Sequence, residues 1–188
     1  MIKQVTQWRV LWTEFRPTFH FVGLFLVVFI VGNVVYGLFV SYFDPEPDPL
    51  TILVTKQSSS FLNLIGFETT TFIHSSLATI SILNKGRAIV SVYEGCNGVN
   101  IMVVFLAFLI AFPKPARSPV RWVGFLGCIL IHLINVMRID VLFGVAFYYP
   151  EFLYIYHKYI FTATIYGIVF LLWLLWVRWI FKQPIPNK

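Results

Sequence analysis

Residues 94–112 read EGCNGVNIMVVFLAFLIAF. A polar, glycine-containing entrance, Glu94-Gly95-Cys96-Asn97-Gly98, precedes an almost uninterrupted apolar run from Val99 to Phe112. The whole chain shares this bias, because 59% of its 188 residues are hydrophobic, only 12% are charged and the mean hydropathy is +0.80. Such a composition is far from that of an ordinary soluble domain and predicts an integral membrane protein.

The apolar sequence divides into several candidate membrane spans. They cover residues 19–43, 98–112, 122–149 and 159–181. Proline or charged residues follow each of them, and tyrosine and tryptophan are frequent at their ends, as in an interfacial belt. We therefore predict that residues 1–188 form one all-α integral membrane domain. It would have about four transmembrane helices, interfacial amphipathic helices and a small extracytoplasmic β-hairpin. The first run lacks a small-residue cleavage site and is interpreted as retained.

Basic residues indicate the orientation of these spans. The predicted inner flanks hold one acid, Glu14, and the bases Lys3, Arg9, Arg16, Lys114, Arg117, Arg121, Arg178, Lys182 and Lys188. The opposite flanks hold the acids Asp44, Glu46, Asp48, Glu68 and Glu151. By the positive-inside rule both termini are cytoplasmic, and the connections 44–95 and 150–158 face outward. The net charge of +6 is thus a topology signal and needs no nucleic-acid partner.

Other segments are predicted to lie on the membrane surface or outside it. Residues 1–18 alternate apolar and basic side chains at helical spacing, which predicts a cytoplasmic interfacial helix. Residues 50–65 could form a second amphipathic helix, which would lie on the outer surface of the membrane. Residues 78–83 and 87–93, rich in Ile, Val and Ser on either side of Asn84-Lys85-Gly86, predict a β-hairpin that leads into the polar entrance.

Three polar groups on different spans fall at one predicted depth. Measured along α-helices from the inner ends of their spans, Cys96 lies about 24 Å, Arg138 about 26 Å and His157 about 32 Å away. Because the hydrocarbon core is about 30 Å thick, all three fall at its outer boundary. Helical spacing also predicts that Asn100 shares the face of Cys96 and that Asn135 shares the face of Arg138. We expect these groups to form one site.

Each polar residue also has a purely structural interpretation. A free cysteine is a common small apolar residue, which is the interpretation adopted for Cys128. Arg138 could extend to the outer headgroups, and His157 taken alone could be an ordinary interfacial histidine. An intramembrane arginine is nevertheless a functional candidate by default. His20, His74 and His132 are expected to be structural, and Asp140 to point away from Arg138 and mark the water boundary.

The cysteines and histidines do not follow the patterns of other kinds of site. Cys96 and Cys128 do not resemble a disulfide framework. No Cys, His or acidic residues occur at zinc-ligand spacing. We therefore expect no metal and no other cofactor.

A thiol, a guanidinium and an imidazole suit acyl transfer. Cys96 would be the nucleophile, since a nearby cation favours the reactive thiolate. Arg138 would hold that thiolate or the oxyanion of the intermediate. His157 would act as general base and then protonate the leaving amine. Asn97, Asn100 and Asn135 are the candidate supporting residues.

At these positions the chain resembles the exosortase/archaeosortase family of membrane transpeptidases. Glu94-Gly95-Cys96-Asn97-Gly98 matches the family's nucleophile motif, Asn135-Val136-Met137-Arg138-Ile139 its arginine motif, and His157 its third position. The similarity covers residues 88–179 and is specific because the three motifs occur in order with the right separations. Within the family the chain is similar to the short exosortase F subfamily of Bacteroidetes.

The resemblance implies an activity, a location and partners. It implies a cysteine transpeptidase of the cell inner (cytoplasmic) membrane, with its site on the extracytoplasmic side. Such an enzyme removes C-terminal sorting tails from secreted proteins through a thioacyl intermediate, and then transfers the new carboxyl end to a surface acceptor. The expected partners are those tailed proteins, a lipid or glycan acceptor, membrane lipids and, as a further candidate, a small associated membrane protein. Longer exosortases have additional spans that are missing here.

Two other classes of function stay open at this point. A non-enzymatic scaffold or transporter subunit would use the same polar residues for helix packing, although it leaves their common depth unexplained. A simple hydrolase would use water in place of the acceptor. Replacing Cys96 and Cys128 separately would discriminate between these classes.

Overall fold

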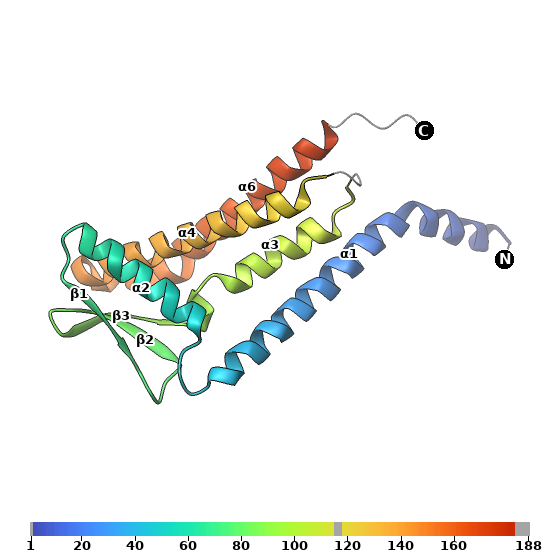
Figure 1. The fold of residues 1–188 in the computed structure, drawn as a ribbon. Coiled ribbons are helices and arrows are strands. Elements are labelled where there is room, and N and C mark those ends of the chain that lie inside the picture. The colour runs from blue at the N-terminus through green and yellow to red at the C-terminus, as the bar shows by residue number, and fades with distance from the viewer. Residues whose placement is uncertain (1, 115–117, 183–188) are drawn as a thin grey trace.

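The computed structural model describes residues 2–114 and 118–182, with side chains described from residue 14 onward. In this part of the chain the protein is mostly helical, with a small three-stranded sheet (Figure 1). Within the same residues, three helical segments are long and apolar enough to cross a membrane, namely 14–43, 120–148 and 150–181. The sheet lies at one end of the helices, and the N-terminal end of α1 and the C-terminal end of α6 lie at the other (Figure 1).

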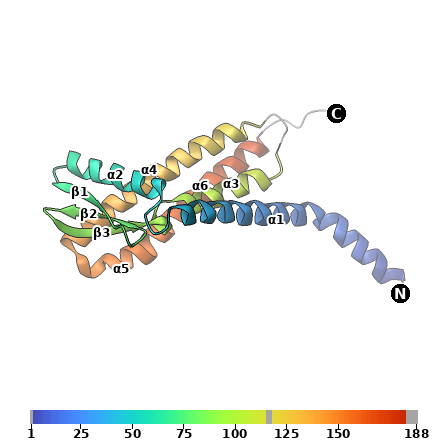
Figure 2. The ribbon, with the colours of Figure 1, turned by 60° about the horizontal axis from the view of Figure 1, so that its bottom comes forward.

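Helix α1 (Ile2–Phe43) is one continuous helix of 42 residues. The predicted interfacial helix at residues 1–18 and the predicted first span are thus parts of the same helix. The N-terminal part of α1 bends away from the rest (Figure 2), and Pro17, which cannot donate a helix hydrogen bond, lies inside the helix. Most of the predicted amphipathic face belongs to the side chains of residues 1–13, which lie outside the described residues.

The second and third predicted spans correspond to helices α3 (Val99–Ala111) and α4 (Val120–Tyr148). The 29 residues of α4 are more than enough to cross a membrane, whereas the 13 residues of α3 rise only about 20 Å. This length is less than a hydrocarbon core of about 30 Å, so a fourth span is not confirmed. Buried side chains join α3, α4 and α6 (Phe161–Phe181) into one cluster: Phe105, Leu109, Ile131, Val169 and Trp176.

The last helical segment begins well before residue 159, where the fourth span was predicted to start. It comprises the 3₁₀ turn η2 (Pro150–Phe152), the single turn α5 (Leu153–Ile155), the π-helical turn η3 (Tyr156–Ile160) and then α6. A π-helical turn carries an extra residue, which rotates the side chains before it relative to those after it. Turns of this kind are rare in proteins, and those that occur are often found at functional sites.

Helix α2 (Pro49–Leu64) begins at Asp48, whose carboxylate accepts hydrogen bonds from the backbone N–H groups of Leu50 and Thr51 at 2.9 and 3.1 Å. The helix buries a mainly polar face made of Thr51, Val54, Thr55, Ser58, Ser59 and Leu62. The apolar side chains predicted to lie on the membrane are, apart from Val54, exposed: Leu50, Leu53, Phe61, Leu64 and Ile65. An exposed apolar face of this kind suits contact with lipid.

The predicted hairpin is confirmed as the antiparallel pair β2 (Thr79–Asn84) and β3 (Arg87–Tyr93). Lys85 and Gly86, with φ of 48° and 81°, turn the chain with the left-handed geometry that two-residue hairpin loops prefer. A third strand, β1 (Thr69–Ile73), which the sequence analysis missed, pairs antiparallel with the other side of β2.

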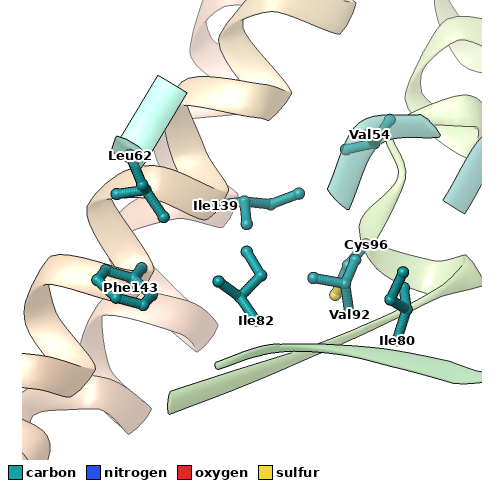
Figure 3. Packing of buried hydrophobic residues seen from close by; sticks show 8 residues of the cluster. All are labelled: Val54, Leu62, Ile80, Ile82, Val92, Cys96, Ile139 and Phe143. Carbon is teal, nitrogen blue, oxygen red and sulfur yellow. The ribbon is translucent and has the colours of Figure 1, made fainter. Parts of the chain in front are cut away.

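One face of the sheet packs against α2 and α4. The buried cluster there contains Ile80, Ile82 and Val92 from the sheet, Val54 and Leu62 from α2, and Ile139 and Phe143 from α4 (Figure 3). Cys96 belongs to the same cluster (Figure 3). The sheet and α2 therefore form a compact cap over one end of α4, and the polar entrance of α3 lies at the edge of this cap.

Candidate functional site

The polar entrance forms a tight connection between the sheet and α3. Glu94 to Cys96 form the 3₁₀ turn η1, and Gly98 adopts the left-handed conformation, with a φ of 84°, immediately before α3 begins. A Cβ atom at Gly98 would also lie only 3.1 Å from Cγ of Asn135 on α4. Both the backbone angle and the close approach to α4 thus require glycine at this position.

Asn97 ties this connection to α1 and α2. Its buried side chain donates hydrogen bonds to the Tyr36 hydroxyl at 2.6 Å and to Oγ1 of Thr51 at 3.0 Å. Its Oδ1 accepts from the backbone N–H of Val99 at 3.1 Å. The Tyr36 hydroxyl in turn donates to the backbone carbonyl of Glu94 at 3.3 Å. These bonds hold η1 from both sides and thereby restrict the position of Cys96.

The structure brings Cys96 and His157 together. The Cys96 sulfur lies 3.7 Å from Nε2 of His157, although the two residues are separated by 61 positions in the chain. Cys96 is buried, and the half-buried His157 belongs to the π-helical turn η3. A thiol and an imidazole at this separation can exchange a proton, since sulfur forms longer hydrogen bonds than oxygen and such pairs are often loose without substrate.

Asn135 of α4 contacts Cys96 directly, whereas Arg138 of the same helix lines a separate cavity between α4 and α6 and acts on the site through its charge. Nδ2 of the fully buried Asn135 donates to the backbone carbonyl of Cys96 at 2.8 Å, which fixes the main chain of Cys96 to α4. Nε of Arg138 is buried and has no hydrogen-bond partner within the described part of the chain. The charge of Arg138 acts electrostatically on the side chains of His157 and Tyr93. A buried N–H group without a partner is available to a ligand.

Tyr93, the last residue of β3, is a further member of the site that the sequence analysis did not single out. The electrostatic interaction with Cys96 and the hydrogen bond to it raise the pKa of the Tyr93 hydroxyl above its ordinary value, while the charge of Arg138 acts in the opposite direction. Tyr93 therefore remains a neutral hydrogen-bonding group at ordinary pH. Its strand position next to the Glu94-Gly95-Cys96 motif was the available signal.

One predicted supporting residue is misplaced. Asn100 is exposed, and the chain from Cys96 to Asn100 is not one α-helix, because the 3₁₀ turn η1 and the left-handed Gly98 intervene. The i+4 relation that predicted a shared face with Cys96 therefore does not apply. Asn97, by contrast, is buried at the site.

Asp140 also differs from the expectation that it marks a water boundary. It is buried on α4 and accepts a hydrogen bond from Ser58 of α2, so it joins two helices.

The remaining candidates lie apart from the site. Cys128 packs at the edge of the α3–α4–α6 cluster, Nε2 of His132 lies 2.7 Å from Oε1 of Gln57, and Nε2 of His74 lies 2.9 Å from Oγ of Ser81.

A cavity of about 500 Å³ opens beside the Cys96–His157 pair. Strand β3, helix α4 and the segment from η2 to η3 surround it, with the lining side chains Ile89, Val90, Ser91, Val92, Cys96, Ile139, Leu142, Pro150, Leu153, Tyr154 and His157. Both the thiol and the imidazole are thus accessible from one space with largely apolar walls. In the described residues, no group of three or more Cys, His, Asp or Glu side chains could hold a metal ion.

A comparison of the chain with models of protein families, with curated proteins and with solved structures finds no match.

Proposed function

We propose that the protein is a membrane-embedded cysteine transpeptidase of the exosortase/archaeosortase family, which cleaves the C-terminal sorting tails from secreted proteins and transfers the new carboxyl end of each protein to a surface acceptor. The observation that carries this proposal is the 3.7 Å approach of the Cys96 sulfur to Nε2 of His157 at the wall of a cavity. Helix packing alone gives no reason to orient a thiol toward an imidazole beside an accessible space.

The proposed reaction begins with transfer of the Cys96 thiol proton to His157. The thiolate attacks the carbonyl carbon of the scissile peptide bond, and Arg138 donates hydrogen bonds to the oxyanion that forms. His157 then gives the proton to the leaving amine as the carbon–nitrogen bond breaks, which leaves a thioester on Cys96. The acceptor's amine or hydroxyl loses a proton to His157 and attacks the thioester. The carbon–sulfur bond then breaks, and His157 returns the proton to the Cys96 sulfur, which restores the thiol.

The membrane placement is part of the same proposal. We place the sheet, α2 and the cavity on the extracytoplasmic side of the cell inner membrane, with both termini in the cytoplasm. Two facts support this orientation: basic residues gather at the predicted inner flanks, and the first turn of α1 and the last of α6 lie at the end opposite the sheet (Figure 1). Helix α3 would be a short fourth crossing, extended at its outer end by η1 and the cap.

The proposed substrate and acceptor are those that the resemblance to the family implies. A tailed protein would present a short motif, a membrane helix and a basic end, and the acceptor would be a lipid or glycan at the cell surface. The apolar cavity beside Cys96 is compatible with an extended peptide, which has few charges of its own.

The test compares two cysteine variants in membranes. Cys96→Ala should stop the shortening of a tailed secreted protein, whereas Cys128→Ala should leave it nearly unchanged, because only Cys96 contacts His157. The size of the tailed protein and the mass of its new carboxyl end are measured at matched enzyme levels. Normal shortening by Cys96→Ala would refute the enzyme proposal in favour of a scaffold, and a free carboxyl end in every product would indicate a hydrolase.

A further inference from the structure

Strand β3 is an edge strand of the sheet. The strand order is β1-β2-β3, so β3 pairs with β2 on one side only. Every second residue of an antiparallel edge strand directs its N–H and C=O groups away from its partner. In the described part of the chain, no backbone hydrogen bond links residues 87–93 to an element outside the sheet. The outer edge of β3 therefore carries unpaired main-chain donors and acceptors.

The cavity beside Cys96 meets this edge. Four consecutive residues of β3, from Ile89 to Val92, line it. Successive residues of a strand direct their side chains to opposite faces, so a cavity lined by four in a row must contact the strand along its edge. Cys96 follows the end of β3 in the chain and lines the cavity together with His157, whose Nε2 lies 3.7 Å from its sulfur. Unpaired hydrogen-bonding groups thus lead along the cavity to the nucleophile.

We propose that the edge of β3 binds the substrate main chain as an added strand, and that this strand is the extended segment immediately N-terminal to the cleavage point. This inference rests on the proposed function and names how that site recognises a peptide. Addition of a strand satisfies the free groups of an edge by main-chain hydrogen bonds, and side-chain pockets supply the selectivity.

The size of the cavity suits such a strand. With a rise of about 3.3 Å per residue, about 4.8 Å between strands and about 10 Å between layers, one added residue occupies about 160 Å³. A cavity of about 500 Å³ therefore accommodates about three residues. Its walls include Ile139, Leu142 and Leu153, so the side chains directed toward α4 and α5 should be apolar.

The direction of the added strand follows from the order of the elements. In the enzyme, β3 runs to η1 and Cys96, and α3 follows. In a tailed protein the extended segment runs to the cleavage point, and a membrane helix follows. If both helices enter the membrane from the same side, the substrate segment runs parallel to β3. Its carbonyl at the cleavage point then reaches Cys96 while the departing helix enters the bilayer.

Disulfide capture tests this arrangement. The full-length enzyme carries Cys96→Ala and Cys128→Ala, which remove both native thiols, together with Ser91→Cys on the β3 edge. The matched control carries Thr70→Cys on β1, the opposite edge of the same sheet, in place of Ser91→Cys. The probe is a tailed secreted protein with single cysteines at successive residues before its cleavage point. Membranes are treated with a mild oxidant, and disulfide-linked complexes are measured on non-reducing gels.

The expected result is capture by Ser91→Cys at every second position of the probe and little capture by Thr70→Cys, since alternate residues of a strand face the same side. Capture without alternation, equal capture at both edges, or disulfides only between two enzyme copies would overturn the proposal. Processing of the same probe by the otherwise unchanged enzyme is measured in parallel. Processing that does not require Cys96 would overturn the proposed function, whereas Cys96-dependent processing without alternating capture would overturn the β3 proposal alone.

Discussion

Replacement of Arg138 by lysine separates the geometric role of its guanidinium from the role of its charge. Nε of arginine is the fourth side-chain atom after Cα, and the corresponding atom of lysine is a carbon. Arg138→Lys therefore keeps a positive charge but deletes the buried N–H group that has no partner among the described residues. If this group donates to the oxyanion, the variant loses a hydrogen bond that forms only during the reaction.

The expected changes in rate and in stability follow from the hydrogen bonding of this N–H group in the transition state and in the resting protein. Loss of one oxyanion donor costs about 2.7–4 kcal/mol in the transition state, which is on the order of 10²–10³ in rate. In the resting protein the same group is buried without a partner, an arrangement that costs about 1–3 kcal/mol, and a methylene removes that cost. Activity should thus fall sharply, while the stability of the folded protein is unchanged or slightly higher.

The assay measures the rate of shortening of a tailed protein in membranes at matched enzyme levels, with thermal unfolding in detergent as the second readout. Arg121→Lys, an exposed substitution near the start of the same helix, is the control and should leave both readouts unchanged. Near-normal processing by Arg138→Lys would refute the geometric argument, because lysine supplies the charge and reaches the headgroups equally well.

Three further predictions concern the nucleophile, the entrance and the topology. Cys96→Ser should abolish processing, because a hydroxyl is much harder to deprotonate than a thiol, and Cys128→Ser should process the tailed protein at close to the normal rate. Gly98→Ala should lower the free energy of unfolding by about 1–3 kcal/mol, since its φ of 84° is strained for alanine and a methyl group would crowd α4. Gly37→Ala, in open space on α1, is its control in thermal unfolding. A reporter inserted in the Lys85–Gly86 turn should be extracytoplasmic and one fused to the C-terminus cytoplasmic; both on one side would contradict the proposed orientation.

The residues around the thiol divide into those that local sequence could identify and those that it could not. Cys96, Arg138 and His157 stood out because a polar group inside an apolar run or next to its end is locally visible. The partners of Asn97 were not visible, because Tyr36 and Thr51 lie 61 and 46 positions away and look like ordinary residues of their helices. The Asn100 prediction failed for a local reason: it assumed one helix across Gly98, where the backbone is left-handed.

The sequence by itself determined the membrane character, the apolar helices and the β2–β3 hairpin, because these depend on composition, on periodicity and on a two-residue turn. Tertiary structure alone decided the rest. Strand β1 forms because β2 offers it a free edge, and Asp140 is buried because Ser58 of α2 reaches it. The cavity exists only where the edge of β3 and the η2–η3 segment face each other. The Asp140–Ser58 bond and the cavity join segments far apart in the chain, and contacts between such segments leave no periodic trace in either one.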